Sequence, residues 1–292
     1  MQYLYHAGRQ QDLEMTVRKT QQRDCRICDR KKALAGVSER YILDADYNVL
    51  GAGALKNNIK VKEAVLPNIK VMEKEAFCSC SALRWIEFPH VTEIREGAFA
   101  NCSNLKAAVF PDSLKKLGDG AFYKCKRMRT ADFTGNESVK VMTEMVFAEC
   151  RQLENLILPA NLKEIQNGAF FKCEGLKEIQ LPDGLLKIGE KAFYQCGLQT
   201  LHLPETLEQI GDCAFMKCKS LEYVRIPASV RRIGKWAFHG CSKLKLVEFV
   251  RDPEEIGEWV TNKDCTLRCQ RGSRMEAYAK EYGMRTEALQ EP

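Results

Sequence analysis

A phenylalanine followed three residues later by a cysteine occurs eight times in this chain, at intervals of 22 to 25 residues. An alanine precedes the phenylalanine in seven of the eight units, and Val146 stands there in the other. A fixed period in this range predicts a solenoid, because each unit forms one coil that buries its apolar edge only against its neighbours. The eight pairs are Phe77 with Cys80, Phe99 with Cys102, Phe122 with Cys125, Phe147 with Cys150, Phe170 with Cys173, Phe193 with Cys196, Phe215 with Cys218 and Phe238 with Cys241.

Each unit also contains two short apolar patterns. Apolar residues alternate with polar ones in Leu176–Pro182 and Leu221–Pro227, which predicts a strand with one buried face. The proline ends that strand, because it has no N–H to donate. A second apolar pair such as Leu162 and Ile165 follows. Eight coils at the usual strand separation of about 4.8 Å would form a rod about 40 Å long.

The full pattern L-x-x-I-x-L-P-x-x-L-x-x-I-G-x-x-A-F-x-x-C is clearest in Leu176–Cys196 and Leu221–Cys241. It resembles the BspA-like, or Treponema-type, leucine-rich repeat family over about residues 51–249. The resemblance implies a β-rich solenoid, a right-handed superhelix of about eight coils. It also implies a non-enzymatic scaffold, often on bacterial surfaces, with interaction roles such as adhesion.

Three regions follow from these patterns: an N-terminal cap of β character at 1–50, the solenoid at 51–250 and a C-terminal cap at 251–292. In the first region, alternation at Glu14–Arg18 and Tyr41–Asp46 predicts short strands. In the last, Ser273 and Glu276 have capping-box spacing, which predicts a helix whose apolar side covers the last coil. Within the solenoid, Thr134 replaces the usual proline and its unit is two residues longer, which predicts a local bulge.

The formal charge of +6 arises from 45 basic and 39 acidic residues, a balance too even to indicate a nucleic-acid partner. The stretch from Met1 to Arg9 has no apolar run of signal-peptide length, and no apolar segment is long enough to span a membrane. We expect a monomer that does not insert into membranes and is located in the cytoplasm. Because the family often occurs on bacterial surfaces, the alternative is a cell-surface adhesin of an anaerobic bacterium that reaches the surface by a route without a signal peptide.

The eight repeated cysteines have two interpretations. Metal storage or redox sensing is one, but buried cysteine commonly behaves as a small apolar group with a weak S–H donor. We expect reduced thiols, which a reducing cytoplasm maintains most easily. Cys25 and Cys28 have the spacing of half a zinc site or a redox pair, and a local disulfide or simple packing is the other interpretation. No metal or other cofactor is expected, and a thiol redox or metal-binding protein using this pair remains the alternative of another class.

Residues between the buried positions of each main strand point outward and form two columns across the sheet. Tryptophan, tyrosine and arginine dominate binding hot spots, and aliphatic residues interrupt otherwise polar columns. A solvated sheet surface is the simpler interpretation. A protein or glycan partner would contact Trp85, Val109, Asp132, Ile157, Gln180, His202, Tyr223 and Arg225. No catalytic constellation or phosphate-binding loop accompanies the lone His202, so we expect no enzyme.

Overall fold

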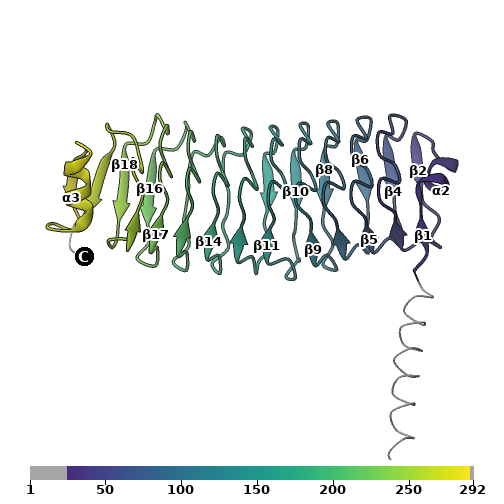
Figure 1. Cartoon of the computed structure of the whole chain (residues 1–292), viewed down its shortest axis with the longest axis horizontal. Coiled ribbons are helices and arrows are strands. Elements are labelled where there is room, and N and C mark those ends of the chain that lie inside the picture. The colour runs from purple at the N-terminus through teal and green to yellow at the C-terminus, as the bar shows by residue number, and fades with distance from the viewer. Residues whose placement is uncertain (1–24, 290–292) are drawn as a thin grey trace, which may run out of the picture.

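The computed structural model describes residues 25–289, which form one elongated rod of stacked coils (Figure 1). The predicted β-solenoid is confirmed: every strand pair is parallel and joins corresponding positions of successive coils. The described residues form about 11 turns, and the expected number of about eight is therefore too low. The additional coils have the same backbone path without the marker residues. One has Leu55 and Asn58 in place of phenylalanine and cysteine, and another has Val260 and Thr261 in place of Ala-Phe.

One side of the rod carries the longer strands, and we call it the long-strand face. Its strands form three parallel sheets, β2-β4-β6, β8-β10-β12 and β16-β18-β20-β21. Two coils between β12 and β16 lack a regular strand on this side. The strands are β2 (Arg40–Ile42), β4 (Glu63–Val65), β6 (Trp85–Glu87), β8 (Ala107–Val109), β10 (Thr130–Asp132), β12 (Asn155–Ile157), β16 (Tyr223–Ile226), β18 (Leu246–Phe249), β20 (Thr266–Cys269) and β21 (Arg285–Ala288).

A second side carries strands of two residues, and we call it the short-strand face. Its strands form two parallel sheets, β1-β3-β5-β7-β9 and β11-β13-β14-β15-β17-β19, so pairing stops between β9 and β11. The strands are β1 (Ile27–Cys28), β3 (Val49–Leu50), β5 (Val71–Met72), β7 (Glu93–Ile94), β9 (Lys116–Leu117), β11 (Val141–Met142), β13 (Glu164–Ile165), β14 (Lys187–Ile188), β15 (Gln209–Ile210), β17 (Arg232–Ile233) and β19 (Glu255–Ile256).

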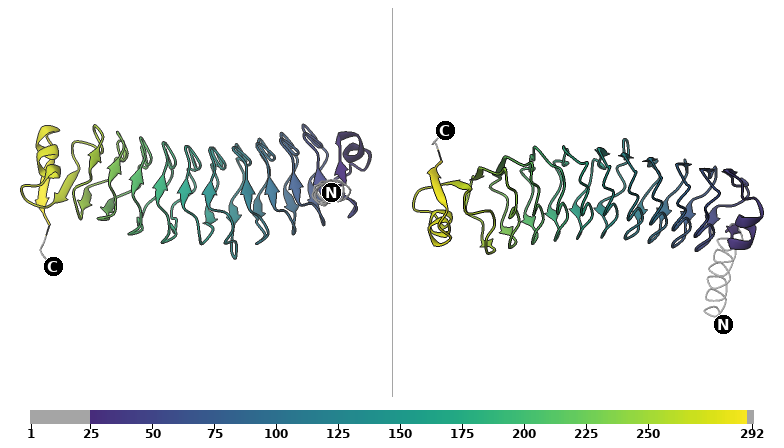
Figure 2. Two further views of the ribbon diagram at one scale, coloured as in Figure 1. Left: turned by 60° about the horizontal axis from the view of Figure 1, so that its bottom comes forward. Right: turned by 90° about the horizontal axis from the view of Figure 1, so that it is seen from above.

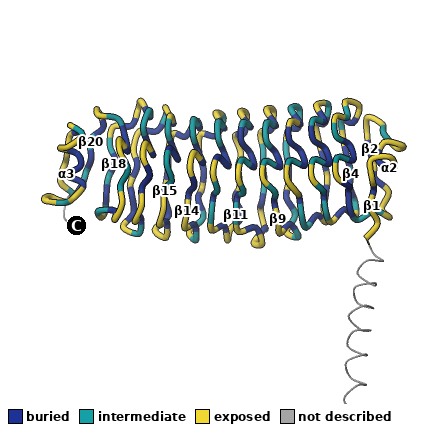
Figure 3. Tube along the Cα trace, viewed as in Figure 1, coloured by how far each residue is buried: buried dark blue, intermediate teal, exposed yellow. Residues whose placement is uncertain are grey.

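The turns with the Ala-Phe pairs close each coil and bury the phenylalanines. Successive rings from Phe77 to Phe238 stack with centroid separations of 5.0 to 5.8 Å. Main-chain bonds join the same turns, as where Phe99 N donates to Ala121 O at 2.7 Å. Figure 3 shows the resulting division between buried interior and exposed outer turns. The phenylalanine column therefore runs through the core of the repeat region.

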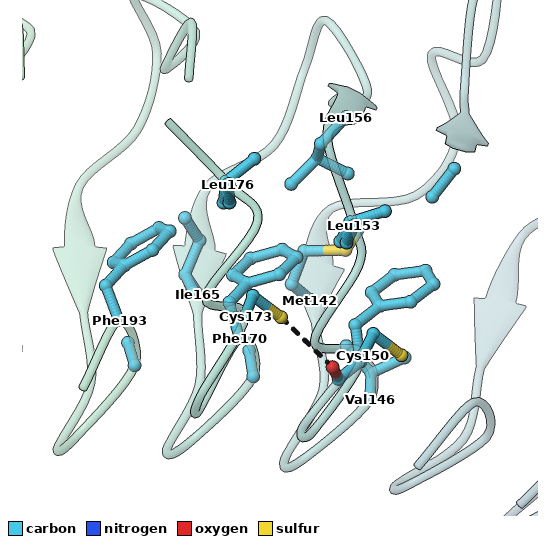
Figure 4. Close-up of a cluster of buried hydrophobic side chains, with 14 of the residues drawn as sticks. Met142, Val146, Cys150, Leu153, Leu156, Ile165, Phe170, Cys173, Leu176 and Phe193 are labelled. Atoms are coloured by element: carbon cyan, nitrogen blue, oxygen red, sulfur yellow. Dashed lines mark hydrogen bonds between the residues drawn. The ribbon is translucent and has the colours of Figure 1, made fainter. Parts of the chain in front are cut away.

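The repeated cysteines form a ladder with one hydrogen-bonding pattern. Each thiol donates to the main-chain carbonyl at the phenylalanine position of the preceding coil, at 3.0 to 3.2 Å. Figure 4 shows one such bond, from Cys173 Sγ to Phe147 O. All fourteen cysteines are free. Burial raises the pKa of the Cys102 and Cys173 thiols well above the usual value, so these groups stay protonated.

Helices lie at the two ends of the rod (Figure 2). Helix α2 (Arg30–Ala35) begins after Asp29, whose side chain accepts from Lys32 N at 2.9 Å. Helix α3 (Arg274–Glu281) begins after Ser273, whose hydroxyl accepts from Glu276 N at 3.2 Å. Its buried residues Met275, Tyr278 and Ala279 face the last coils, and Tyr278 Oη donates to Gly257 O at 2.9 Å.

The sheets extend past both ends of the 51–250 range. Strands β1 and β2 pair with β3 and β4, while β20 and β21 continue the long-strand face beyond β18. The strand expected at Glu14–Arg18 lies outside the described residues.

The extended unit after β10 contains a buried asparagine. Asn136 Nδ2 donates to the carbonyls of Pro111 and Leu114, both at 2.9 Å. Its Oδ1 accepts from Ser138 N at 3.1 Å and Val139 N at 3.0 Å. The Asn136 side chain thus supplies hydrogen-bond partners to two main-chain carbonyls and two main-chain N–H groups in the lengthened turn.

Candidate functional site

The long-strand face brings together three exposed apolar residues in its N-terminal half. Trp85 on β6, Val109 on β8 and Ile157 on β12 expose 43%, 66% and 49% of their surface. Strand register aligns Val109, Asp132 and Ile157 across three successive coils. The sequence predicted this column because side chains alternate between the two faces of a strand.

Two further apolar residues extend this surface and were missed in the sequence. Ile42 on β2 is 63% exposed and aligns with the half-buried Val65 on β4, which in turn aligns with Glu87. The alternation of apolar and polar residues around Tyr41 indicated a strand there. Because this segment lacks the marker residues of the repeat, the strand was assigned to the N-terminal cap. We define the apolar surface as Ile42, Val65, Trp85, Val109 and Ile157.

Two carboxylates within this surface have no cationic partner among the described residues. Glu87 forms no side-chain bond there, and Asp132 Oδ1 accepts only from Thr134 N at 2.8 Å. Both side chains lie beside apolar residues of the same column. The N-terminal half therefore offers apolar area together with unpaired negative charge.

The C-terminal half of the face has the opposite character, because its charges pair with one another. Arg225 Nη1 lies 2.5 Å from Glu205, and its Nε lies 3.8 Å from Glu248. Arg268 then joins Glu248 at 2.9 Å and Glu287 at 3.0 Å. Partial burial and the neighbouring Glu248 carboxylate raise the pKa of Tyr223. Arg225 and Tyr223, both expected partner contacts, thus belong to an internally paired network.

Gln180 and His202 lie on the two coils between β12 and β16 that have no regular strand on this face. Both are exposed. The structure thus separates the expected contact residues into an apolar group, an ion-paired group and these two polar residues.

The cysteine pair near the N-terminal end differs in exposure. Cys25 is exposed, whereas Cys28 is buried and burial raises the pKa of its thiol. A raised pKa disfavours the thiolate that redox or metal chemistry requires. Within residues 25–289, no three His, Cys, Asp or Glu side chains are grouped closely enough to hold a metal ion. No helix in that range is long and apolar enough to cross a membrane.

Parallel coils stacked on a column of phenylalanines, with an exposed strand face, define a leucine-rich repeat solenoid. The family model for the BspA type leucine-rich repeat region matches residues 48–177 and 164–269. The chain belongs to this family, which confirms the resemblance read from the sequence.

One solved structure supports the same fold. A leucine-rich repeat protein from Bacteroides ovatus is 18% identical, with 86% of this chain and 92% of that chain covered and a TM-score of 0.61. A leucine rich cell surface protein from Faecalibacterium prausnitzii is 20% identical, with 86% and 79% covered and a TM-score of 0.40. None of the curated proteins matches the chain.

Proposed function

We propose that this protein is a non-enzymatic scaffold that holds a protein partner on the N-terminal half of its long-strand face. The observation that carries the proposal is the grouping of Trp85, Val109 and Ile157, all exposed, on strands β6, β8 and β12 of the long-strand face. Large apolar side chains grouped on a surface mark interaction sites more often than scattered ones do.

The surrounding charge defines the partner's chemistry. Glu87 and Asp132 lie between the apolar side chains and have no cationic partner in residues 25–289. A partner surface with aliphatic or aromatic groups flanked by lysine or arginine would satisfy both features. A glycan offers few apolar groups to Val109 and Ile157, so the chemistry of the surface favours protein.

We also propose that the protein works in a reducing compartment, the cytoplasm. The support is that all fourteen cysteines are free, with eight of them holding main-chain carbonyls in the ladder. An oxidising environment would favour disulfides over these bonds.

The test compares three immobilised forms of the chain. The first is wild type, and the second carries Trp85→Ala, Val109→Ala and Ile157→Ala. The third is a matched control with Leu186→Ala, Trp236→Ala and Trp259→Ala, which removes exposed apolar residues elsewhere on the rod. Each would be exposed to separate soluble and envelope extracts of the source cells.

We expect a protein from the soluble extract to bind wild type and the control but not the long-strand variant. With that protein purified, titration should give an affinity about 30-fold weaker for the long-strand variant, the loss of about 2 kcal/mol typical of hot-spot residues. Equal binding to all three forms would exclude this face. A partner found only in the envelope extract would contradict the cytoplasmic location.

A further inference from the structure

The short-strand face is interrupted at one place within the described residues, between β9 and β11 (Figure 1). Elsewhere on this face, main-chain bonds join successive coils, as where Gly118 N donates to Ile94 O at 2.7 Å. Gln166 N donates likewise to Met142 O at 2.8 Å. No such bond joins β9 to β11, although Gly120 N of the same coil donates to Glu144 O at 2.8 Å just beyond the two strands.

The interruption is local. On the long-strand face, β8 and β10 of the same two coils pair in register. In the core, the Phe122 and Phe147 rings stack at 5.3 Å. The two added residues of the Thr134–Ser138 turn enter the chain shortly before β11, on the side of the coil where pairing is lost.

Unused hydrogen-bonding groups of both kinds are left at the break. On one side, the N–H groups of Val141 and Thr143 lack the carbonyl partners that the repeat would supply. On the other, the Lys115 and Leu117 carbonyls receive no donor from the described chain. The buried Thr143 hydroxyl also has no partner there. A buried polar group without a partner, such as the Thr143 hydroxyl, is rare in native structures, and the main-chain groups beside it are free to bond a ligand.

A cavity of about 700 Å³ opens at this break, with walls from both sides of it. Ile94, Leu117 and Val141 contribute apolar area, and the Thr143 side chain also lines the cavity. The space is therefore bordered by the two unpaired strand edges.

Positive charge is in excess around the cavity. The acidic residues are already paired, with Arg95 bonded to Glu73 and Glu93, and Lys74 to Glu96. Lys115 and Lys116 form no ion pair within residues 25–289, and Lys140 Nζ donates only to the Glu137 carbonyl at 2.7 Å. Three lysines thus stand at the rim without a carboxylate.

We propose that the break between β9 and β11 binds an extended acidic peptide segment, which adds between the two strands and completes the short-strand sheet. The peptide carbonyls accept from Val141 N and Thr143 N, and its N–H groups donate to the Lys115 and Leu117 carbonyls. Its carboxylates pair with the three rim lysines. An isolated anion would satisfy the donors and leave the carbonyls unpaired, so the peptide group is the better complement.

The first measurement uses a fluorescent pentapeptide that alternates glutamate and valine, titrated by anisotropy at low salt into the full chain. A matched peptide with lysine in place of glutamate tests charge, and one with N-methylated valines removes main-chain donors. We expect the acidic peptide to bind about tenfold or more tightly than either control, since each removes one component of the complementarity. Binding of the N-methylated peptide with equal affinity would overturn strand pairing.

Protein variants locate the site. A form with Lys115→Glu, Lys116→Glu and Lys140→Glu should bind about tenfold more weakly or worse. A control with Lys177→Glu, Lys219→Glu and Lys243→Glu carries the same change in net charge at exposed lysines outside the cavity, and should bind like wild type. If both variants bound the peptide equally weakly, the loss of affinity would come from the net charge of the protein and not from the lysines at the cavity. That result would contradict the proposal.

Hydrogen exchange gives a direct readout at the strand edge. The amides of Val141 and Thr143 should exchange readily in the free protein and become protected when the peptide is bound. Unchanged exchange at both positions, with the peptide bound, would overturn the proposal. The Trp85, Val109 and Ile157 variant should bind the peptide normally, which keeps this test independent of the long-strand face.

Discussion

At the scale of single residues, each complete repeat needs two backbone positions in the left-handed region. One directly precedes the Ala-Phe pair, as at Lys191 with φ of 53°, and the other directly precedes the ladder cysteine, as at Gln195 with φ of 58°. Glycine occupies these positions in some coils, for example Gly168 and Gly240, but lysine, glutamine and tryptophan occupy them in others. A non-glycine residue there costs about 1 kcal/mol.

Replacing Gln195 with glycine should therefore stabilise the protein. Gln195 forms one main-chain bond to Met216 O, which glycine retains, and the left-handed strain is relieved. We expect Gln195→Gly to raise the free energy of unfolding in urea by about 0.5 to 1 kcal/mol. The control Lys245→Gly, at a position without positive φ, should be neutral or destabilising. A destabilised Gln195→Gly protein would show that the side chain, not the backbone, decides this position.

Single residues also show which features of the repeat could be predicted from the sequence and which could not. The buried Phe and Cys roles were predictable, because each type recurs at one position. The left-handed positions were not, because backbone geometry recurs there while side-chain type does not. Asn58 occupies the cysteine position of its coil, and its Oδ1 accepts from Lys60 N and Val61 N at 2.9 and 3.0 Å.

At the scale of elements, the turn after β10 shows how a longer connection is accommodated. The sequence predicted a bulge from Thr134 and the added residues. The loss of pairing between β9 and β11 was not predictable, because it depends on the path of the backbone after the turn. Ile42 was missed for a related reason, because its coil keeps the strand geometry but has Leu55 and Asn58 in place of the marker residues. Val65 belongs to the unit of Phe77 and Cys80, so its place in the column could have been predicted from the repeat.

Asn136 should be essential to that turn. Its side chain bonds four main-chain groups in a fully buried position, so Asn136→Ala leaves them without partners. We expect the free energy of unfolding to fall by about 2 to 4 kcal/mol, measured by urea denaturation. Asn161→Ala, on an exposed turn of the next coil, should change it by no more than about 0.5 kcal/mol. A similar small change for Asn136→Ala would mean that water replaces the amide in this turn.

At the scale of the whole molecule, the stacked coils enclose many protonated thiols. Burial raises the pKa of Cys102, Cys125, Cys173 and Cys218 well above the usual value, and that of Cys265 to about 11. In the unfolded chain the pKa of a cysteine thiol is about 8.5. The unfolded state therefore binds fewer protons than the folded state in alkaline solution, and this contribution to stability is lost as pH rises.

We accordingly expect the free energy of unfolding to be constant around neutral pH and to fall above about pH 8.5. The limiting slope is about 1.4 kcal/mol per pH unit for each buried thiol. Urea denaturation in reducing buffer at several pH values would measure it. For Cys173→Ala, the free energy of unfolding should fall less steeply with pH, by about the contribution of one thiol to the slope. A free energy of unfolding that rises with pH would contradict the assignment of buried, protonated cysteines.

The break between β9 and β11 also divides the rod mechanically. Force applied along the long axis is shared by three columns of contacts in most coils, namely the long strands, the short strands and the phenylalanine turns. At this one junction of the described coils the short-strand column is missing, so the load falls on β8 with β10 and on the stacked rings. The junction is accordingly weaker along the axis than coils with all three columns, and a peptide bound there would restore the missing contacts.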